Sequence, residues 1–77
     1  MNMYANVTVY ELRPVDSESM TLTYQLAGCV DVNINCVESF RTVKDPQTKK
    51  ALVKLTMISG KEYIIDEASE YLIRSKG

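Results

Sequence analysis

The sequence predicts a mostly β fold of the α+β type: a small antiparallel sheet of five to six strands, strongly curved or barrel-like, with a short C-terminal helix. Three observations predict this fold. Apolar and polar residues alternate in several segments, turn-forming residues separate these segments, and a capped helical pattern ends the chain. The 77 residues predict a single domain over 1–77, because two cores would each be too small to fold unaided.

An N-terminal hairpin is predicted over residues 3–27. Residues 4–13 are rich in strand formers, and Pro14 is expected to end this strand because proline cannot donate to a ladder. A polar loop follows over residues 14–19. In the returning strand, over residues 20–27, every second residue is apolar, which predicts a strand with one solvated face. The apolar residues are Met20, Leu22, Tyr24 and Leu26.

Strands and a second hairpin are predicted over residues 29–65. Gly28 permits a bend, after which Val30 and Val32 resume the alternation. The parity of the apolar residues then becomes ambiguous over residues 35–38. A bulge or one irregular turn in this segment would re-aim the strand and restore the parity.

The stretch from Leu52 to Leu72 predicts two strands that are joined by a tight turn and run into a helix. A loop over residues 45–50 precedes it, with Pro46 placed to start a turn. Ser59-Gly60 is expected as a two-residue hairpin loop, since Gly60 can adopt a positive φ. Residues 63–65 form the return strand. The side chains expected to face the core are Val53, Leu55 and Met57.

A helix is predicted over residues 66–75. Asp66 is expected to be its N-cap, and Glu67 and Glu70 lie near the positive end of the helix dipole. An apolar face with the spacing i, i+3, i+4 is expected to pack on the sheet. This face consists of Ala68, Tyr71 and Leu72.

Over residues 34–74 the chain contains an apolar-Glu pair, a Pro-x-Thr loop, a strand, a Gly-Lys turn and a return strand, in that order. The matching residues are Ile34-Asn35, Val37-Glu38-Ser39, Pro46, Thr48, Leu52-Val53-Lys54-Leu55-Thr56, Gly60-Lys61 and Tyr63-Ile64-Ile65. This pattern resembles the FlbD family of small flagellar and swarming-associated proteins, over about half of the chain. The resemblance implies the fold of this stretch and brings no catalytic residues. The sequence departs from the family in its first 27 residues and at Lys49–Ala51.

Basic residues gather between positions 41 and 54. This segment has five basic residues and one acid, whereas the rest of the chain has four basic and nine acidic residues. Such a segment suits a phosphate group or an acidic protein surface, and it equally suits a solvated hairpin whose lysines discourage edge pairing. A pI near 5.3 is low for a nucleic-acid binder. The candidate partner-binding residues here are Arg41, Lys44, Lys49, Lys50 and Lys54.

Five tyrosines are many for a chain of this length. Tyr24 and Tyr71 fall on predicted apolar faces and are expected in the core. Tyr4 and Tyr10 share the even face of the first strand, so they are exposed if the valines of that strand are the buried side. Exposed tyrosines suit a protein interface or base stacking. Tyr4 and Tyr10 therefore join the candidate partner-binding residues.

No arrangement of residues predicts catalysis. The chain has no histidine, no phosphate-binding loop and no nucleophile with a base beside it. Asp66, Glu67 and Glu70 are explained by the start of a helix, and the DxNxN pattern of residues 31–35 lacks the Gly and Glu of a calcium loop. We therefore expect a protein that is not an enzyme, with no catalytic residue, cofactor or metal.

The two cysteines, Cys29 and Cys36, are expected to be free, half-buried thiols. Their spacing fits neither a zinc motif nor a thioredoxin motif, and it would point them to opposite faces of one regular strand. No segment resembles a signal peptide or reaches the ~18 apolar residues of a membrane span. A cytoplasmic location without a membrane partner is expected.

These features favour a non-enzymatic protein-interaction module, such as a phage- or mobile-element-type regulator or inhibitor. It would bind another protein through a sheet surface or an edge strand and self-associate as a homo-oligomer, because a core this small gains stability cheaply from a second copy. One alternative is a nucleic-acid-binding β domain that uses the basic 41–54 hairpin, with Tyr10 or Tyr63 stacking on bases. The other is a structural component of a larger assembly.

Overall fold

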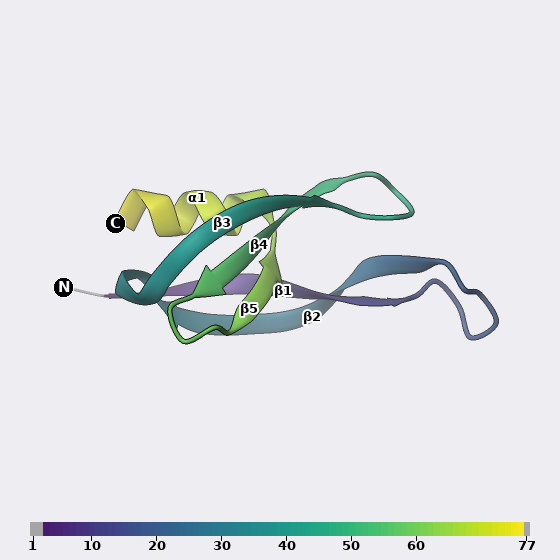
Figure 1. The fold of residues 1–77 in the computed structure, drawn as a ribbon, viewed down its shortest axis with the longest axis horizontal. Helices are drawn as coiled ribbons and strands as arrows, with labels where there is room; N and C mark the ends of the chain where they lie inside the picture. The colour runs from purple at the N-terminus through teal and green to yellow at the C-terminus, as the bar shows by residue number, and fades with distance from the viewer. Residues whose placement is uncertain (1–2, 77) are drawn as a thin grey trace.

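In the part of the chain that the structure describes, five antiparallel strands form one curled sheet in the order β2-β1-β5-β4-β3, and a single α-helix follows the last strand (Figure 1). This computed structural model describes residues 3–76. The elements are β1 (Tyr4–Pro14), β2 (Leu22–Asn33), the 3-10 turn η1 (Ile34–Cys36), β3 (Val37–Lys44), β4 (Ala51–Met57), β5 (Glu62–Ile65) and α1 (Glu67–Lys76). The predicted mostly β fold with a C-terminal helix is confirmed. The sheet has five strands and is curled without closing into a barrel.

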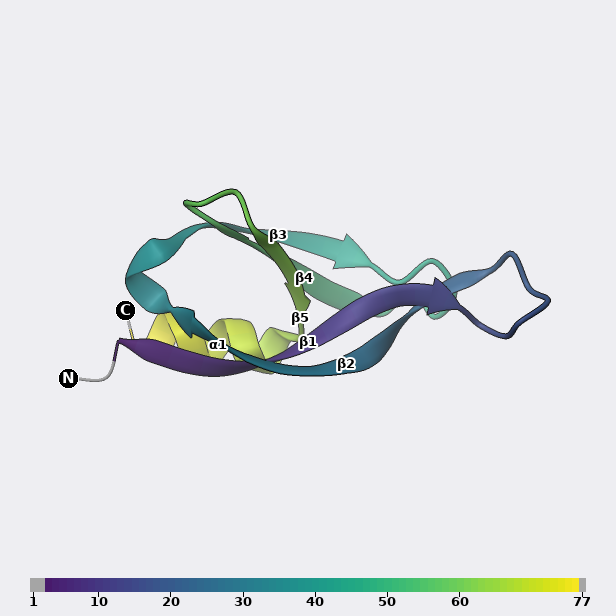
Figure 2. The same cartoon turned by 90° about the horizontal axis from the view of Figure 1, so that it is seen from below.

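The molecule is elongated, with extents of 47 × 20 × 18 Å. Figures 1 and 2 show the cause: the β1–β2 hairpin is long, and its tip projects beyond the β3–β4 hairpin and the helix. β1 ends at Pro14, as expected for a residue that cannot donate to a ladder. The body of the molecule therefore lies at one end of the long axis and a two-stranded extension at the other.

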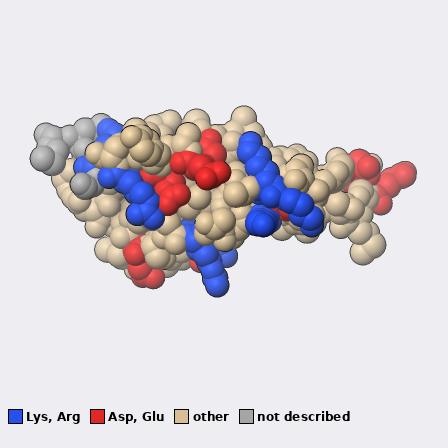
Figure 3. Space-filling model, turned by 90° about the horizontal axis from the view of Figure 1, so that it is seen from above, with Lys and Arg blue, Asp and Glu red and all other residues tan. Residues whose placement is uncertain are grey.

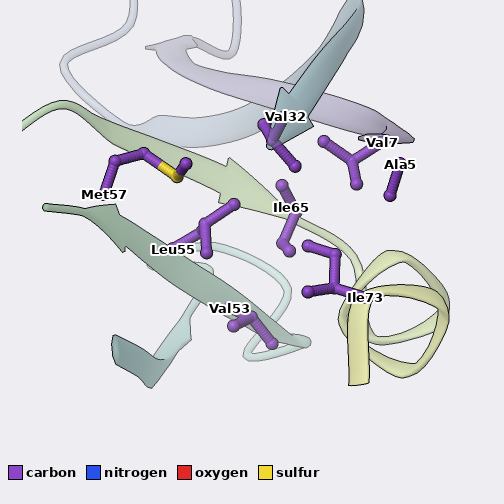
Figure 4. Packing of buried hydrophobic residues seen from close by; sticks show 8 residues of the cluster. All are labelled: Ala5, Val7, Val32, Val53, Leu55, Met57, Ile65 and Ile73. Atoms are coloured by element: carbon purple, nitrogen blue, oxygen red, sulfur yellow. The ribbon is translucent and has the colours of Figure 1, made fainter. Parts of the chain in front are cut away.

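The core lies where the β1–β2 hairpin, the β4–β5 hairpin and α1 meet (Figure 4). Leu55, Ile65 and Val7 are the largest of its fully buried side chains. The inward positions predicted for β4 are confirmed: Val53, Leu55 and Met57 are buried and alternate regularly with less buried residues. The buried cluster consists of Ala5, Val7, Val32, Val53, Leu55, Met57, Ile65 and Ile73.

β2 runs without interruption from Leu22 to Asn33, so the expectation of two strands separated by a bend at Gly28 is wrong. The ladder between β1 and β2 instead contains a bulge. Val9 pairs with Gly28 and the next residue, Tyr10, pairs with Leu26, which leaves one extra residue in β2. Gly28 has a φ of +138°, which glycine adopts without the penalty a Cβ brings.

The irregular turn predicted over residues 35–38 is confirmed. Asn33 accepts a hydrogen bond from the N–H of Asn35 on its side chain (2.9 Å), which starts η1. The ladder between β3 and β4 shifts register between Val37 and Ser39. This turn carries the chain from one edge of the sheet to the other. Cys36 lies in it, half-buried and free.

Two other local expectations need correction. The β4–β5 loop spans residues 58–61 and is longer than the expected Ser59-Gly60 pair, although Gly60 does adopt a positive φ of +92°. The extra length is accommodated by hydrogen bonds from Gly60 N to the Met57 carbonyl and from Met57 N to the Lys61 carbonyl, both 2.8 Å. Cys29 is exposed on β2, where it was expected to be half-buried.

The helix begins where it was predicted. Asp66 Oδ1 accepts a hydrogen bond from the N–H of Ser69 at 2.8 Å, the geometry of an N-cap. The predicted packing face is wrong, because Ala68, Tyr71 and Leu72 are exposed, Tyr71 to 76%. The buried residues of α1 are Ser69 and Ile73.

The reason for this difference is how α1 lies against the sheet. α1 contacts β1 and β4, and the Ser69 hydroxyl accepts a hydrogen bond from the N–H of Thr8 at 3.1 Å. That bond requires a small polar residue close to the β1 backbone. The buried stripe therefore contains one serine and one isoleucine, spaced i and i+4, and Tyr71 turns outward.

Candidate interaction surface

The distal part of the β1–β2 hairpin forms an arm. We define the arm as residues 10–26. Within the described chain, β1 pairs with β5 only at Val9 and Tyr10, so beyond Tyr10 the hairpin continues as a two-stranded ribbon (Figures 1 and 2). The two faces of this ribbon differ in chemistry.

One face of the arm is apolar. The cross-strand register places six residues on it in three pairs, because directly opposite residues lie on the same side of a sheet. The pairs are Tyr10 with Leu26, Leu12 with Tyr24, and Pro14 with Leu22. We call this set the arm face. Leu26 is 69% exposed and Leu12 44% exposed, and Met20 in the loop beyond them is 97% exposed.

The opposite face of the arm is polar. Glu11 pairs with Gln25, and Arg13 pairs with Thr23. Arg13 Nε donates to Glu11 Oε2 at 3.0 Å, an exposed ion pair within one strand. The arm is therefore amphipathic, and its apolar residues gather on one side.

The bulge at Gly28 decides which side that is. Val30 and Val32 pair with core-facing residues of β1, so they point inward. Beyond them the extra residue Ala27 reverses the parity of β2, and Leu26 points to the opposite side. The large apolar residues of β2 from Leu22 to Val32 have even numbers. A regular strand without a bulge would therefore place all of them on the same face. Gly28 was the available signal, because an isolated glycine inside a strand pattern marks a bulge.

Asp45 holds the middle of the arm against the β3–β4 loop. Its Oδ2 accepts hydrogen bonds from the Thr23 hydroxyl (2.7 Å) and the Tyr24 N–H (2.9 Å). Its Oδ1 accepts from the N–H groups of Gln47 (2.8 Å) and Thr48 (3.2 Å). One buried carboxylate thereby joins the edge of β2 to the loop that follows β3. From the sequence, Asp45 stood out only as the start of a loop and the single acid of a basic segment.

These bonds also set the acidity of Asp45. Burial raises the pKa of this carboxyl, but the hydrogen bonds from Thr23, Tyr24, Gln47 and Thr48 outweigh burial and lower the pKa to about 2. The carboxylate is therefore charged throughout the physiological range, and each of its oxygens has two donors.

The predicted basic residues lie around the β3–β4 hairpin, where Figure 3 shows blue side chains gathered on one face. Arg41 and Lys54 are directly opposite each other in the ladder. Lys54 in turn pairs with Ile64, and Ile64 with Tyr10, so one row across the sheet joins the basic residues to the arm face. The exposed lysines near the loop are Lys44, Lys49 and Lys50.

The structure separates the two candidate tyrosines. The valines face the buried side of β1, the condition under which both tyrosines would be exposed. Tyr4 is exposed, but the expectation is wrong for Tyr10. Tyr4 lies at the end of β1 remote from the arm, opposite Asn33. Tyr10 is half-buried, and its hydroxyl donates to Asp66 Oδ2 at 3.4 Å. Burial raises the pKa of Tyr10, and the charge of the Asp66 carboxylate and this hydrogen bond raise it further. Tyr24, expected in the core, is half-buried on the arm face.

A cavity of about 580 Å³ opens where β2, η1 and the β4–β5 loop meet. Val32, Cys36, Met57 and Tyr63 line it, and the Lys61 ammonium lies 5.5 Å from the centre of the Tyr63 ring. Its apolar walls can receive an apolar group. Within residues 3–76, no group of three or more His, Cys, Asp or Glu side chains could hold a metal ion, and no helix has the length and apolar character needed to cross a membrane.

Comparisons with protein-family models, with curated proteins and with solved structures each found no match. The resemblance to the FlbD family stays an expectation from the sequence.

Proposed function

We propose that this protein is a non-enzymatic protein-interaction module that binds another protein through the arm face. The observation that carries the proposal is the exposure of Leu26 and Leu12 within a continuous set of six apolar and aromatic residues. Contiguous apolar surface of this kind on a small domain marks an interaction site, because leaving it in water costs free energy that burial against a partner recovers.

The support beneath the arm face strengthens the proposal. The backbone ladder between β1 and β2 continues to the pair of Pro14 and Leu22, and Asp45 anchors the arm at Thr23 and Tyr24. A surface that is already ordered loses less conformational entropy on binding than a flexible loop does. A small cytoplasmic regulator or inhibitor, of the kind that phages and mobile elements encode, would act through such a surface.

A pull-down with two matched variants tests this function. Tagged wild type, Leu26→Lys and Tyr71→Lys are incubated with a lysate of the cells that encode the chain. Both substitutions replace an exposed apolar side chain by lysine, one on the arm face and one on the outer side of α1. Wild type and Tyr71→Lys should retain the same protein, and Leu26→Lys should lose it. Equal retention by wild type and Leu26→Lys would contradict the proposal.

A second candidate function is nucleic-acid binding. The observation that favours it is the pairing of Arg41 with Lys54. Like charges directly opposite each other destabilise a sheet, so this pair is not explained by a contribution to the stability of the fold. A phosphate backbone would neutralise this pair and the lysines near the loop. Tyr10 lies in the same cross-sheet row and could stack on a base.

A gel-shift titration separates this candidate from the first. Binding of single-stranded RNA or duplex DNA should be present at about 50 mM salt and fall steeply by about 200 mM. Lys54→Gln should weaken it, whereas Lys76→Gln at the end of α1 is the control. No shift at the lower salt concentration with either nucleic acid would remove this candidate.

A further inference from the structure

We propose that the arm face is occupied by a second copy of this chain, so that two copies pack arm on arm across a twofold axis. This inference rests on the proposed function and names the partner. The two copies contact each other through the faces of their arms, and no strand of one copy pairs with an edge strand of the other.

The charge of the arm face favours a second copy. In a twofold interface the same patch meets itself, so a charge near the axis meets a like charge. The arm face carries no charged side chain at neutral pH. Of the ionic residues of the arm, Glu11 and Arg13 lie on its other side, and Asp16 and Glu18 lie in the loop at its tip. The polar side-chain groups of the arm face are the hydroxyls of Tyr10 and Tyr24. A face of this composition meets its own copy without repulsion.

The size of the arm face is also suited to an interface between two copies. Its exposed side chains and Met20 offer on the order of 500 Å² of apolar surface, within the range of the largest patches on monomers. A stable interface buries about 800 Å² on each partner, with an apolar centre and a polar rim. Thr21, which precedes Leu22 in the chain and is exposed, can contribute to such a rim at the tip of the arm.

The edges of the sheet are less suited to a second copy. On β2, the Tyr24 N–H is occupied by Asp45, which interrupts the row of backbone donors that edge pairing needs. On β3, the other edge strand, Glu38, Arg41 and Lys44 are exposed. Charged side chains on an edge discourage pairing with another strand. Face-to-face packing uses none of these groups.

The register indicates where the twofold axis lies. The arm face has three rows, and the pair of Leu12 and Tyr24 is the middle one. Two such faces that overlap fully bring their middle rows together. Leu12 of one copy should therefore lie near Leu12 of the other.

Sedimentation equilibrium measures the association. Wild type should pass from the 8.7 kDa monomer to twice that mass between roughly 1 and 200 µM, a micromolar dissociation constant. Leu26→Lys should raise this constant at least about 100-fold, because dimerisation would bury an unpaired charge. Tyr71→Lys should leave it unchanged. Circular dichroism confirms that each variant keeps the fold, which is expected because both sites are exposed.

A charge-pair experiment tests the identity of the partner. Leu12→Lys and Leu12→Asp should each be monomeric, since like charges would meet at the axis. Mixing the two should restore dimers, because each Leu12→Lys copy meets a Leu12→Asp copy. Variants that remain monomeric when mixed would overturn the arm-on-arm packing.

The two proposals fail in different ways. A wild type that stays monomeric at about 200 µM would overturn the second-copy inference. The proposed function would survive that result if the pull-down still depends on Leu26, and it would fall if Leu26→Lys retains what wild type retains. Dimers that persist in Leu26→Lys at wild-type strength would overturn the inference as well.

Discussion

The carboxylate of Asp45 accepts the backbone N–H of Tyr24 at 2.9 Å, across the space between the two edge strands of the sheet. β2 and β3 stand at opposite ends of the strand order, so no ladder bonds join them. This carboxylate forms a bridge between the arm and the β3–β4 loop. It also occupies the N–H of Tyr24, which would otherwise be a free donor on the edge strand β2.

Replacement of Asp45 should therefore destabilise the fold. Asp45→Ala removes four acceptor bonds at once and leaves the N–H groups of Tyr24, Gln47 and Thr48 without this partner. We expect the melting temperature to fall by roughly 5–10 °C. Asp16→Ala is the control, because Asp16 accepts a bond from Glu18 N in the exposed arm loop and should have little effect. Equal melting temperatures for the wild type and Asp45→Ala would contradict this role.

The stability should depend on pH through the same carboxyl. Its pKa is about 2 in the folded protein and 3.8 in the unfolded chain, so the unfolded chain binds the proton more tightly. The stabilisation is complete above pH 3.8 and is lost as the pH falls toward about 2. Urea unfolding at a series of pH values measures how steeply the free energy of unfolding changes with pH. Asp45→Asn should flatten this dependence, and a slope that is unchanged in Asp45→Asn would assign it to other carboxyls.

Ser69 should matter more than its size suggests. Ser69→Ala leaves the half-buried N–H of Thr8 without its acceptor, which costs about 1–2 kcal/mol in the free energy of unfolding. Ser75→Ala is a matched control on the same helix, since the Ser75 hydroxyl donates to the Leu72 carbonyl at an exposed site. Urea denaturation of the two variants compares them. A loss in Ser75→Ala as large as that in Ser69→Ala would point to helix propensity instead.

Tyr10 should ionise late. Burial and then the Asp66 carboxylate raise its pKa above the ordinary 10.0, so the contribution of Tyr10 to stability is present below pH 10 and is lost as the pH rises through the raised value. When the ionisation of the tyrosines is followed by absorbance, one phase should lie above pH 10.0. Tyr10→Phe should remove the phase, and Tyr71→Phe should retain it. A late phase that survives in Tyr10→Phe belongs to another tyrosine.

Gly28 should tolerate substitution poorly despite open space around it. No atom lies within 4 Å of the position a Cβ would take, so the cost comes from the backbone alone, at a φ of +138°. Gly28→Ala should destabilise the protein by about 1–3 kcal/mol. Gln25→Ala, at an exposed and regular position of the same strand, is the control. A neutral Gly28→Ala would show that β2 can pair without this conformation.

Much of the fold follows from short-range patterns. Pro14 ends β1, the Asp45–Lys50 segment forms a loop, and Asp66 caps the helix, because each depends on the backbone chemistry of a few neighbouring residues. The inward positions of β4 were also predictable, since a regular strand has a strict period of two.

The candidate surface was less predictable for a definite reason. The apolar residues from Leu22 to Val32 have one parity, and the alternation alone cannot show that one extra residue at the bulge sends them to two faces. The helix face was mistaken for a related reason, because the contact of Ser69 with Thr8 depends on how α1 meets β1. Hydropathy identifies which residues are apolar without revealing which of them find a partner.

The sequence by itself determined the strands, the loops, the helix cap and the surplus of strand-forming and apolar residues, since these follow from local conformational preference and periodicity. Only the tertiary structure decided that Leu12 and Leu26 remain exposed on one face of the arm, and that Asp45 joins the arm to the body. Both results depend on contacts between segments far apart in the chain, and such contacts follow from strand register, which a one-residue bulge is enough to change.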